Sequence, residues 1–143
     1  MIKYIITGGA GFIGSHLVEA LVKKKCKVVV LDNLSTGRFE NIKRYRKKIK
    51  FIKCDISKKG KWIKEFKGNC YVFHLAALAD IVPSIQNPKK YFQSNVIGTL
   101  NILESCKNAT ILKLIYSASS SCYGIPKLYP TNEISEIDPR YPY

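Results

Sequence analysis

A glycine-rich turn near the N-terminus restricts this chain to a narrow set of folds. The segment Thr7-Gly-Gly-Ala-Gly-Phe-Ile-Gly14 follows a short β-rich run, residues 2–7, and leads into residues 12–24, whose apolar positions have helical spacing. Asp32 stands 18 residues after Gly14, at the end of a second apolar run. A glycine-rich turn between a strand and a helix, with an acidic residue after the next strand, is the arrangement in which dinucleotides bind.

The residue types in this turn suit a bound pyrophosphate. Glycine adopts backbone angles closed to other residues, and without a Cβ its backbone can approach a phosphate closely. Free N–H groups and the dipole at the start of the helix attract the negative charge. The carboxylate of Asp32 accepts hydrogen bonds from a ribose and repels a 2′-phosphate, which favours NAD over NADP, and Arg38 would weaken that preference. The alternative is a structural glycine turn without a ligand.

The rest of the chain alternates short apolar runs with helical patterns. The expected strands are 2–7, 27–31, 50–54, 70–74 and 111–116, and the expected helices are 12–24, 39–48, 58–67 and a long one starting near Pro88. Strands that are apolar on both faces are typical of a parallel sheet covered by helices on both sides. Right-handed crossovers then predict an α/β fold, a doubly wound parallel (Rossmann) sheet with strand order 3-2-1-4-5. Residues 117–143, which hold four prolines, are expected to be irregular.

Composition narrows the setting of the protein. The 143 residues are about one domain's worth of chain, and 46% hydrophobic residues are enough to form a core. No apolar run approaches the roughly 20 residues that a membrane span needs, so no membrane partner is expected. The five cysteines are widely spaced and form no C-x-x-C pair. This pattern favours reduced thiols, a cytoplasmic location and no metal site.

The charge is strongly positive and concentrated in one segment. The net charge is +14, and residues 38–67 hold 13 basic residues against three acidic ones. Such a segment is one mark of a nucleic-acid-binding surface. However, few of these residues are arginines and few aromatic residues stand among them, as base stacking would need. The favoured interpretation is a lysine-rich solvated surface without a nucleic-acid partner.

Further segments resemble the NAD-dependent epimerase/dehydratase family of extended short-chain dehydrogenases/reductases. Besides the glycine-rich turn, the resemblance rests on Asp32–Gly37, Cys54–Ile56, His74–Ala77 and Asn95–Asn101. Within the family these segments most resemble UDP-glucose and UDP-N-acetylhexosamine 4-epimerases. The resemblance covers essentially the whole chain and implies a Rossmann domain that binds NAD.

The resemblance implies a role for each matching residue around NAD. Asp32 and Asn33 would hold the adenosine ribose, and Asp55 would accept a hydrogen bond from the adenine amino group. For Asp55 the alternative is an acid at a helix N-terminus, and His74, at the end of a buried strand, is expected to be structural. The implied cofactor-binding set is Gly8, Gly11, Phe12, Ile13, Gly14, Asp32, Asn33, Ser35, Thr36, Gly37, Asp55, Ile56, Ala76, Ala77, Ala79 and Asn95.

A serine-rich segment, Tyr116–Gly124, matches the catalytic loop of the family. Counting back four residues from Tyr123 makes Ser119 the catalytic hydroxyl. The segment Pro139–Tyr143 resembles the start of the family's Y-x-x-x-K motif, which makes Tyr143 the catalytic base. The alternative is a polar loop after a strand. The expected substrate-binding residues are Ser84, Ser119 and Ser121.

The lysine of this motif is expected four residues after Tyr143, beyond the last residue of the sequence. In the family that lysine binds the nicotinamide ribose and activates the tyrosine. We therefore expect residues 1–143 to be an incomplete NAD-binding domain, an N-terminal fragment without its substrate domain and inactive by itself. The full-length protein is expected to be a homodimer acting on a nucleotide sugar.

The residues after Ser119 bear on the type of reaction. By resemblance, the dehydratases of the family carry Asp-Glu at this place, where this chain has Ser120 and Ser121. The missing acids favour a UDP-hexose 4-epimerase, in which hydride passes from the sugar to NAD and returns to the opposite face. The alternatives are another dehydratase or reductase of the family, or a non-catalytic nucleotide-binding module.

Overall fold

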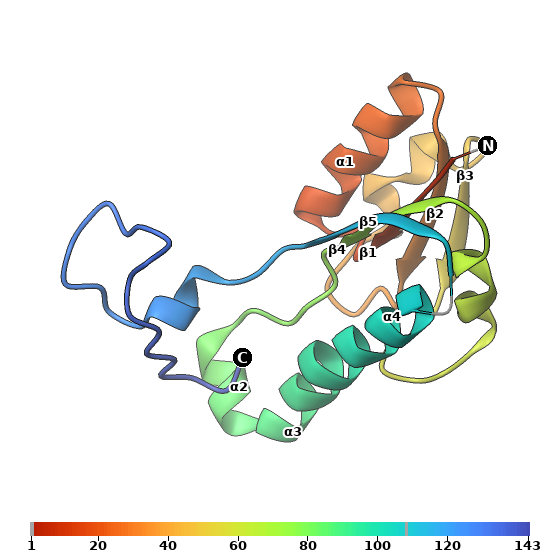
Figure 1. Cartoon of the computed structure of the whole chain (residues 1–143). Helices are drawn as coiled ribbons and strands as arrows, with labels where there is room; N and C mark the ends of the chain where they lie inside the picture. Colours follow the sequence, from red (N-terminus) through yellow and green to blue (C-terminus); the bar gives the residue numbers. More distant parts are fainter. Residues whose placement is uncertain (1, 108) are drawn as a thin grey trace.

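The fold is a single parallel sheet with helical segments on both faces (Figure 1). The structure, a computed structural model, describes residues 2–107 and 109–143. The strand order β3-β2-β1-β4-β5 and the parallel pairing confirm the predicted topology. The strands are β1 (Lys3–Thr7), β2 (Lys27–Asp32), β3 (Ile49–Lys53), β4 (Cys70–His74) and β5 (Ile111–Tyr116).

Alternating side chains of the strands fill two separate apolar cores. On one face, Ile6 and Val30 pack with the buried face of α1 (Phe12–Lys23), which includes Val18. On the other face, Ile5, Val29 and Leu31 belong to a second core. That core is completed from outside the sheet by Trp62, Phe66 and Ile102. Because strands buried on both faces leave only their ends open, the sheet can offer a site at its carboxyl edge.

Two of the expected helices are only short 3₁₀ turns. In place of a helix over 39–48, the chain forms η1 (Phe39–Asn41) and η2 (Lys43–Tyr45), with Ile42 buried between them. A continuous α-helix would stack like charges four residues apart, Lys43 on Lys47 among them, which is unfavourable. In place of a helix over 58–67, the chain forms η3 (Lys61–Phe66).

The helical region before β5 differs from the single helix predicted to start near Pro88. It contains α3 (Pro88–Tyr91), a six-residue π-helical segment η4 (Phe92–Ile97) and α4 (Gly98–Lys107). A separate helix, α2 (Ile81–Gln86), precedes it and was not predicted. Asn87 separates α2 from α3, and its side chain accepts a hydrogen bond from the Lys90 N–H at the start of α3.

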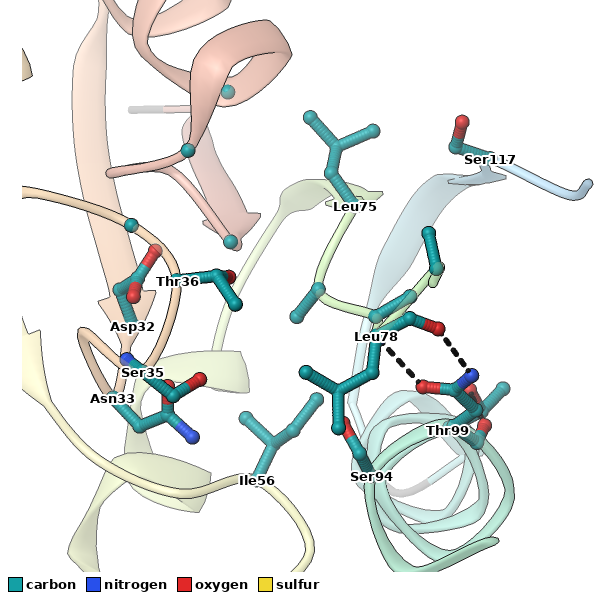
Figure 2. Close-up of a pocket in the computed structure, with 18 of the residues that line it drawn as sticks. Asp32, Asn33, Ser35, Thr36, Ile56, Leu75, Leu78, Ser94, Thr99 and Ser117 are labelled. Carbon is teal, nitrogen blue, oxygen red and sulfur yellow. Dashed lines mark hydrogen bonds between the residues drawn. The ribbon is translucent and has the colours of Figure 1, made fainter. Parts of the chain in front are cut away.

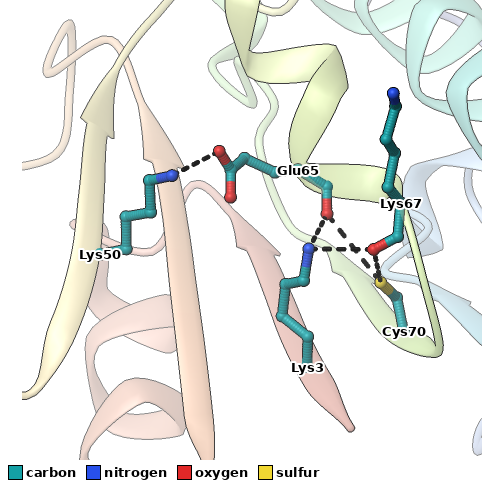
Figure 3. A network of polar contacts seen from close by, with 5 residues as sticks. All are labelled: Lys3, Lys50, Glu65, Lys67 and Cys70. Carbon is teal, nitrogen blue, oxygen red and sulfur yellow. Dashed lines mark hydrogen bonds and ion pairs between the residues drawn. The ribbon is translucent and has the colours of Figure 1, made fainter. Parts of the chain in front are cut away.

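A network of polar contacts joins the amino end of the sheet to the end of η3 (Figure 3). The ammonium group of Lys3 donates to the main-chain carbonyls of Glu65 and, at 3.1 Å, of Lys67. The carboxylate of Glu65 also pairs with Lys50 of β3 at 2.6 Å. Lys3 thus satisfies carbonyls at the end of η3 that have no partner within that turn.

The basic segment 38–67 builds β3, an edge strand of the sheet, and the turns around it. Part of its charge is balanced by acidic residues: Arg44 pairs with Glu19, and Lys59 pairs with Glu104. Exposed lysines along an edge strand also discourage edge-to-edge association.

After β5 the chain forms a wide loop away from the sheet, drawn in blue in Figure 1. Its regular structure within 117–143 is one short turn, η5 (Ser120–Tyr123), as the prolines predicted. The N–H of Asp138 donates to the carbonyl of Cys122 at 2.8 Å, which holds the two arms of the loop together. In the part of the chain that the structure describes, none of the helices has the length and apolar character that crossing a bilayer requires.

Candidate functional site

One cavity of about 690 Å³ opens at the carboxyl edge of the sheet (Figure 2). Its walls come from the carboxyl ends of all five strands and the residues that follow them, from the start of α1, from η4 and α4, and from the last residues of the chain. All members of the predicted cofactor-binding set line this cavity, and so do Ser119 and Tyr143. The structure therefore brings together residues that are spread over the whole sequence.

The glycine-rich turn forms one wall, and each of its glycines is needed for a different physical reason. Gly8 has a φ of +68°, and a Cβ there would lie 2.8 Å from the Ala76 nitrogen. A Cβ at Gly14 would lie 2.6 Å from the Cα of Gly9, so this glycine is needed for the packing of the turn itself. Gly11 has an ordinary φ of −74°, and a Cβ there would contact only the Gly8 carbonyl oxygen, at 3.2 Å, among the described atoms. Gly11 therefore keeps space open on the cavity side.

The start of α1 faces the same space. Gly11 is its N-cap residue and provides no side-chain cap, and the first turn has no acidic residue. The N–H groups of Phe12, Ile13 and Gly14 thus begin a 12-residue helix at the cavity wall. Unpaired N–H groups and the helix dipole favour an anion at this place. The turn, with Gly11 left open and the helix start uncapped, fits a pyrophosphate group.

Asp32 is fixed at the end of β2 by two backbone donors. Its carboxylate accepts from the Ala10 N–H at 2.9 Å and from the Leu34 N–H at 2.8 Å, and the residue is only 7% exposed. Each oxygen still has a second lone pair for a hydroxyl donor. Asn33 Oδ1 accepts from the Ser35 N–H at 2.9 Å, which folds the loop over the adjoining part of the cavity. This arrangement fits the ribose of an adenosine.

Asp55 and Ile56 form the floor after β3. Asp55 Oδ1 accepts from both the N–H and the hydroxyl of Ser57, at 2.9 and 2.8 Å. Ile56 is buried and touches the α4 start so closely that a Cβ at Gly98 would lie 3.1 Å from it. An apolar side chain beside a fixed carboxylate suits an adenine ring.

The opposite wall consists of residues 75–79, held by η4. Asn95 Oδ1 accepts from the Leu78 N–H at 2.9 Å, and Asn95 Nδ2 donates to the Leu78 carbonyl at 2.8 Å, the two dashed lines beside Leu78 in Figure 2. The same loop supplies Ala76, Ala77 and Ala79 to the cavity. These small side chains leave the wall flat and the cavity wide.

The predicted catalytic residues Ser119 and Tyr143 line the same cavity as Asp32. The hydroxyl of Ser119 accepts from the Ser121 N–H at 3.2 Å and caps η5. The hydroxyl of Ser121 is hydrogen-bonded to the phenol of Tyr143. Ser121 thus contacts the predicted base, although it is not itself part of the cavity lining.

Ser84 lies away from the cavity. It is fully buried in α2, and its hydroxyl donates to the Ile81 carbonyl at 2.6 Å. In this position Ser84 supports α2, and the prediction that it binds substrate has no support from the geometry.

The cavity also includes residues that the sequence did not single out. Most of them are next to predicted site residues in the sequence, and this proximity was the signal that could have identified them. They are Leu31, Cys54, Leu75, Leu78, Ser94, Val96, Thr99, Tyr116, Ser117, Ala118 and Pro142. Burial, with the nearby charges of Asp32 and Asp55, raises the pKa of the Cys54 thiol to about 11, so Cys54 is a neutral thiol at pH 7.

Comparison with known proteins agrees with this geometry. A family model described as GDP-mannose 4,6 dehydratase matches residues 5–143. The chain belongs to this family. It is a member of the NAD-dependent epimerases and dehydratases, as the resemblance of its motifs predicted.

Individual relatives carry 4-epimerase names. The chain is 37% identical to a UDP-glucose 4-epimerase of Lactobacillus helveticus, over 99% of this chain and 42% of the relative. A solved UDP-N-acetylglucosamine 4-epimerase from Methanobrevibacter ruminantium, in complex with UDP-N-acetylmuramic acid, is 40% identical with a TM-score of 0.91, over 99% of this chain and 45% of that one. A Thermus thermophilus UDP-glucose 4-epimerase solved with NAD is 36% identical with a TM-score of 0.86, over 99% and 46%. The chain spans less than half the length of each of them.

Proposed function

We propose that this chain is the NAD-binding part of a nucleotide-sugar 4-epimerase of the UDP-hexose type. The observation that carries the proposal is the single cavity, which joins the glycine-rich turn and Asp32 to Ser119 and Tyr143. A nucleotide-binding wall and a pair of hydroxyl groups in one cavity suit oxidation and reduction of a sugar alcohol. The names of the relatives at 36–40% identity support the same class of reaction.

In this proposal the residues hold NAD along the carboxyl edge. Asp32 and Asn33 bind the adenosine ribose, Asp55 and Ile56 bind the adenine, and the start of α1 binds the pyrophosphate. Residues 76–79 and Asn95, which line the cavity, would hold the nicotinamide half. When bound there, NAD would supply an acceptor for the hydride of the sugar C4 and a donor for its return.

The proton of the hydroxyl group on the sugar C4 is removed and returned by side chains of this protein. The phenolate of Tyr143 takes the proton from the sugar hydroxyl and becomes a phenol, which gives the proton back to the oxygen after the keto sugar has presented its other face. Because the Ser119 hydroxyl oxygen accepts from the Ser121 N–H, its O–H remains available to donate to the sugar oxygen. Ser121 orients the phenol through its own hydroxyl.

The epimerase is favoured over the dehydratase in the name of the family model. Elimination of water needs an acid and a base beside C5 and C6, and the dehydratases of the family carry Asp-Glu for it. This chain has Ser120 and Ser121 there, and a neutral hydroxyl is a weak acid and a weak base at pH 7.

The proposal also includes a homodimer. Phe92, Val96, Leu100 and Leu103 are each about half exposed and follow one another at helical spacing along η4 and α4. An exposed apolar stripe of this kind is typical of a surface that another subunit covers. The mass of the full-length protein by light scattering tests this part, and a monomer at micromolar concentration would contradict it.

The experiment for the activity uses the full-length protein, UDP-galactose and NAD, with products followed by NMR. We expect interconversion with UDP-glucose and no 4-keto-6-deoxy sugar. Ser119→Ala should lower kcat by about 10²-fold or more, and the matched control Ser120→Ala, outside the cavity lining, should retain activity. A 4-keto-6-deoxy product would show a dehydratase instead, and NAD binding without any turnover would favour a non-catalytic module.

A further inference from the structure

His74 lies fully buried behind the cavity wall, where three elements meet. It is 1% exposed and ends β4. Its Nδ1 is 2.6 Å from Thr7 Oγ1 at the end of β1, and its Nε2 is 2.9 Å from Thr99 Oγ1 in α4. The ring of Tyr116, at the end of β5, stacks on the imidazole with centroids 5.5 Å apart. These three neighbours carry no charge at neutral pH.

The hydrogen bonds around Thr7 determine which nitrogen of His74 carries the proton. Thr7 Oγ1 accepts from the N–H groups of Leu75 and Ala76, both at 3.1 Å, although Leu75 shares its N–H with the Thr7 carbonyl. A hydroxyl oxygen has two lone pairs and one proton. With both lone pairs occupied, the Thr7 hydroxyl must donate to His74 Nδ1, which therefore has no proton.

The direction of the remaining bonds follows. A neutral imidazole without a proton on Nδ1 carries it on Nε2, so His74 donates to Thr99 Oγ1. The Thr99 hydroxyl then uses its own proton to donate to the Asn95 carbonyl at 2.5 Å. Asn95 in turn holds Leu78 through both of its amide atoms. The chain of bonds therefore starts at residues 75–76 and returns to residue 78 of the same loop.

We propose that His74 is a positioning residue that is fixed as the Nε2–H tautomer. In this tautomer it connects a series of hydrogen bonds that all donate in one direction, from Thr7 through His74 and Thr99 to Asn95. The series holds loop 75–79 against both the glycine-rich turn and η4. Its importance for catalysis rests on the proposed function, because this loop is the wall assigned to the nicotinamide half of NAD. The tautomer and the coupling to Leu78 do not depend on that function.

The position of Thr7 strengthens the argument. Thr7 is the residue before Gly8, whose backbone lies so close to Ala76 that no Cβ fits between them. The Thr7 hydroxyl bonds to the N–H of the same Ala76. The contact between turn and loop is thus fixed by sterics at Gly8 and by hydrogen bonds at Thr7, and His74 connects both to α4.

The first test is the tautomer of His74 by ¹⁵N NMR of the imidazole rings. The chain has two histidines, so a His16→Gln variant assigns the signals. We expect His74 Nδ1 to give the shift of an unprotonated nitrogen and Nε2 that of a protonated one at pH 7. The Nδ1–H tautomer, averaging between tautomers, or an imidazolium at that pH would overturn the proposal.

The second test is hydrogen exchange at the Leu78 amide in three variants. Thr99→Val keeps the shape but removes both the acceptor for His74 and the donor to Asn95, and should speed exchange at Leu78 by about tenfold. Thr99→Ser keeps the hydroxyl and should restore protection, which a purely steric role of Thr99 would not predict. The control Thr110→Val changes an exposed threonine after α4 and should leave exchange unchanged. Unchanged protection at Leu78 in a folded Thr99→Val variant would refute the coupling, whether or not the protein proves to be an epimerase.

Discussion

The side-chain amide of Asn95 pairs with both backbone polar atoms of Leu78, as a neighbouring strand would. Asn95 lies in the π-helical segment Phe92–Ile97. The main-chain carbonyl of Asn95 accepts from the Thr99 hydroxyl at 2.5 Å. The helix and the loop are therefore joined at the point where the cavity wall forms.

Asn95→Asp should loosen the loop more than Asn95→Ala. An aspartate would still accept from the Leu78 N–H, but it would place a negative oxygen against the Leu78 carbonyl, where Nδ2 now donates. Two facing acceptors repel, whereas alanine leaves room for water. We expect Asn95→Asp to lower the free energy of unfolding by about 1–3 kcal/mol, measured by urea denaturation. Equal stability of Asn95→Asp and the parent chain would contradict this.

Gly11 and Gly14 should separate ligand binding from folding. Gly11→Ala puts a methyl group into the open side of the turn with an acceptable backbone, so the protein should fold and bind NAD at least about tenfold more weakly, which is about 1.4 kcal/mol. The bulkier Gly11→Val should abolish binding. Gly14→Ala places its Cβ against the Gly9 Cα and should instead destabilise the fold. Fluorescence titration with NAD and thermal unfolding measure the two effects.

Retained NAD affinity in a folded Gly11→Val variant would mean that the glycine-rich turn is structural only. If Gly11→Ala lost both NAD binding and the fold, Gly11 would be needed for folding, as Gly14 is. This result would contradict the geometry.

Much of the fold and the site could be predicted because the relevant signals are local. The strands end where Thr7 and Asp32 stand, and parallel topology alone brings those ends to one edge. Except for Asn95, which lies in η4, the predicted cofactor-binding residues lie near strand ends or in the turns that follow them, so motif matching places them at the cavity without knowledge of side-chain contacts.

The missed features depend on contacts or on small energetic differences. Phe92 and Val96 are four residues apart whether the segment is α- or π-helical, so apolar spacing cannot reveal η4. That Ser84 binds substrate stays a prediction, and the sequence did not show that its hydroxyl bonds within α2. The series of hydrogen bonds through His74 joins it to Thr7, 67 positions away in the sequence, and to Thr99, 25 positions away. Only the folded structure shows the direction of these hydrogen bonds.

Asp32 should set the preference between the two nicotinamide dinucleotides. We expect NAD to bind at least about tenfold more tightly than NADP, or about 1.4 kcal/mol, because the buried carboxylate would face the 2′-phosphate. Asp32→Asn removes the negative charge and should narrow the difference, mainly by improving NADP binding. Isothermal titration of both dinucleotides against both proteins checks this, and equal affinities in the parent protein would refute it.

Lys3 should contribute to stability through the η3 carbonyls (Figure 3). Lys3→Met keeps the aliphatic length but leaves the carbonyls of Glu65 and Lys67 without this donor, and should cost about 1.5–3 kcal/mol. The matched control is Lys27→Met, because Lys27 faces Lys3 in the β1–β2 register and is exposed.

Lys50→Met removes the ion pair with Glu65, in which the lysine side chain is 60% exposed, and should lower the free energy of unfolding by no more than about 1 kcal/mol. Equal losses for Lys3→Met and Lys27→Met would contradict the capping role.

His74 should make the free energy of unfolding depend on pH between about 6.5 and 4. Burial lowers the pKa of His74 to about 4, from an ordinary value of 6.5. In the unfolded chain the imidazole takes up a proton as the pH falls through 6.5, whereas in the folded protein it stays neutral until about pH 4. The free energy of unfolding should therefore decrease between pH 6.5 and 4, by up to about 3 kcal/mol. Urea denaturation at intervals of pH measures this slope. His74→Asn should flatten this slope, and His16→Gln, at an exposed position of α1, is the matched control. An unchanged slope in a folded His74→Asn variant would show that the buried imidazole is not the group that titrates.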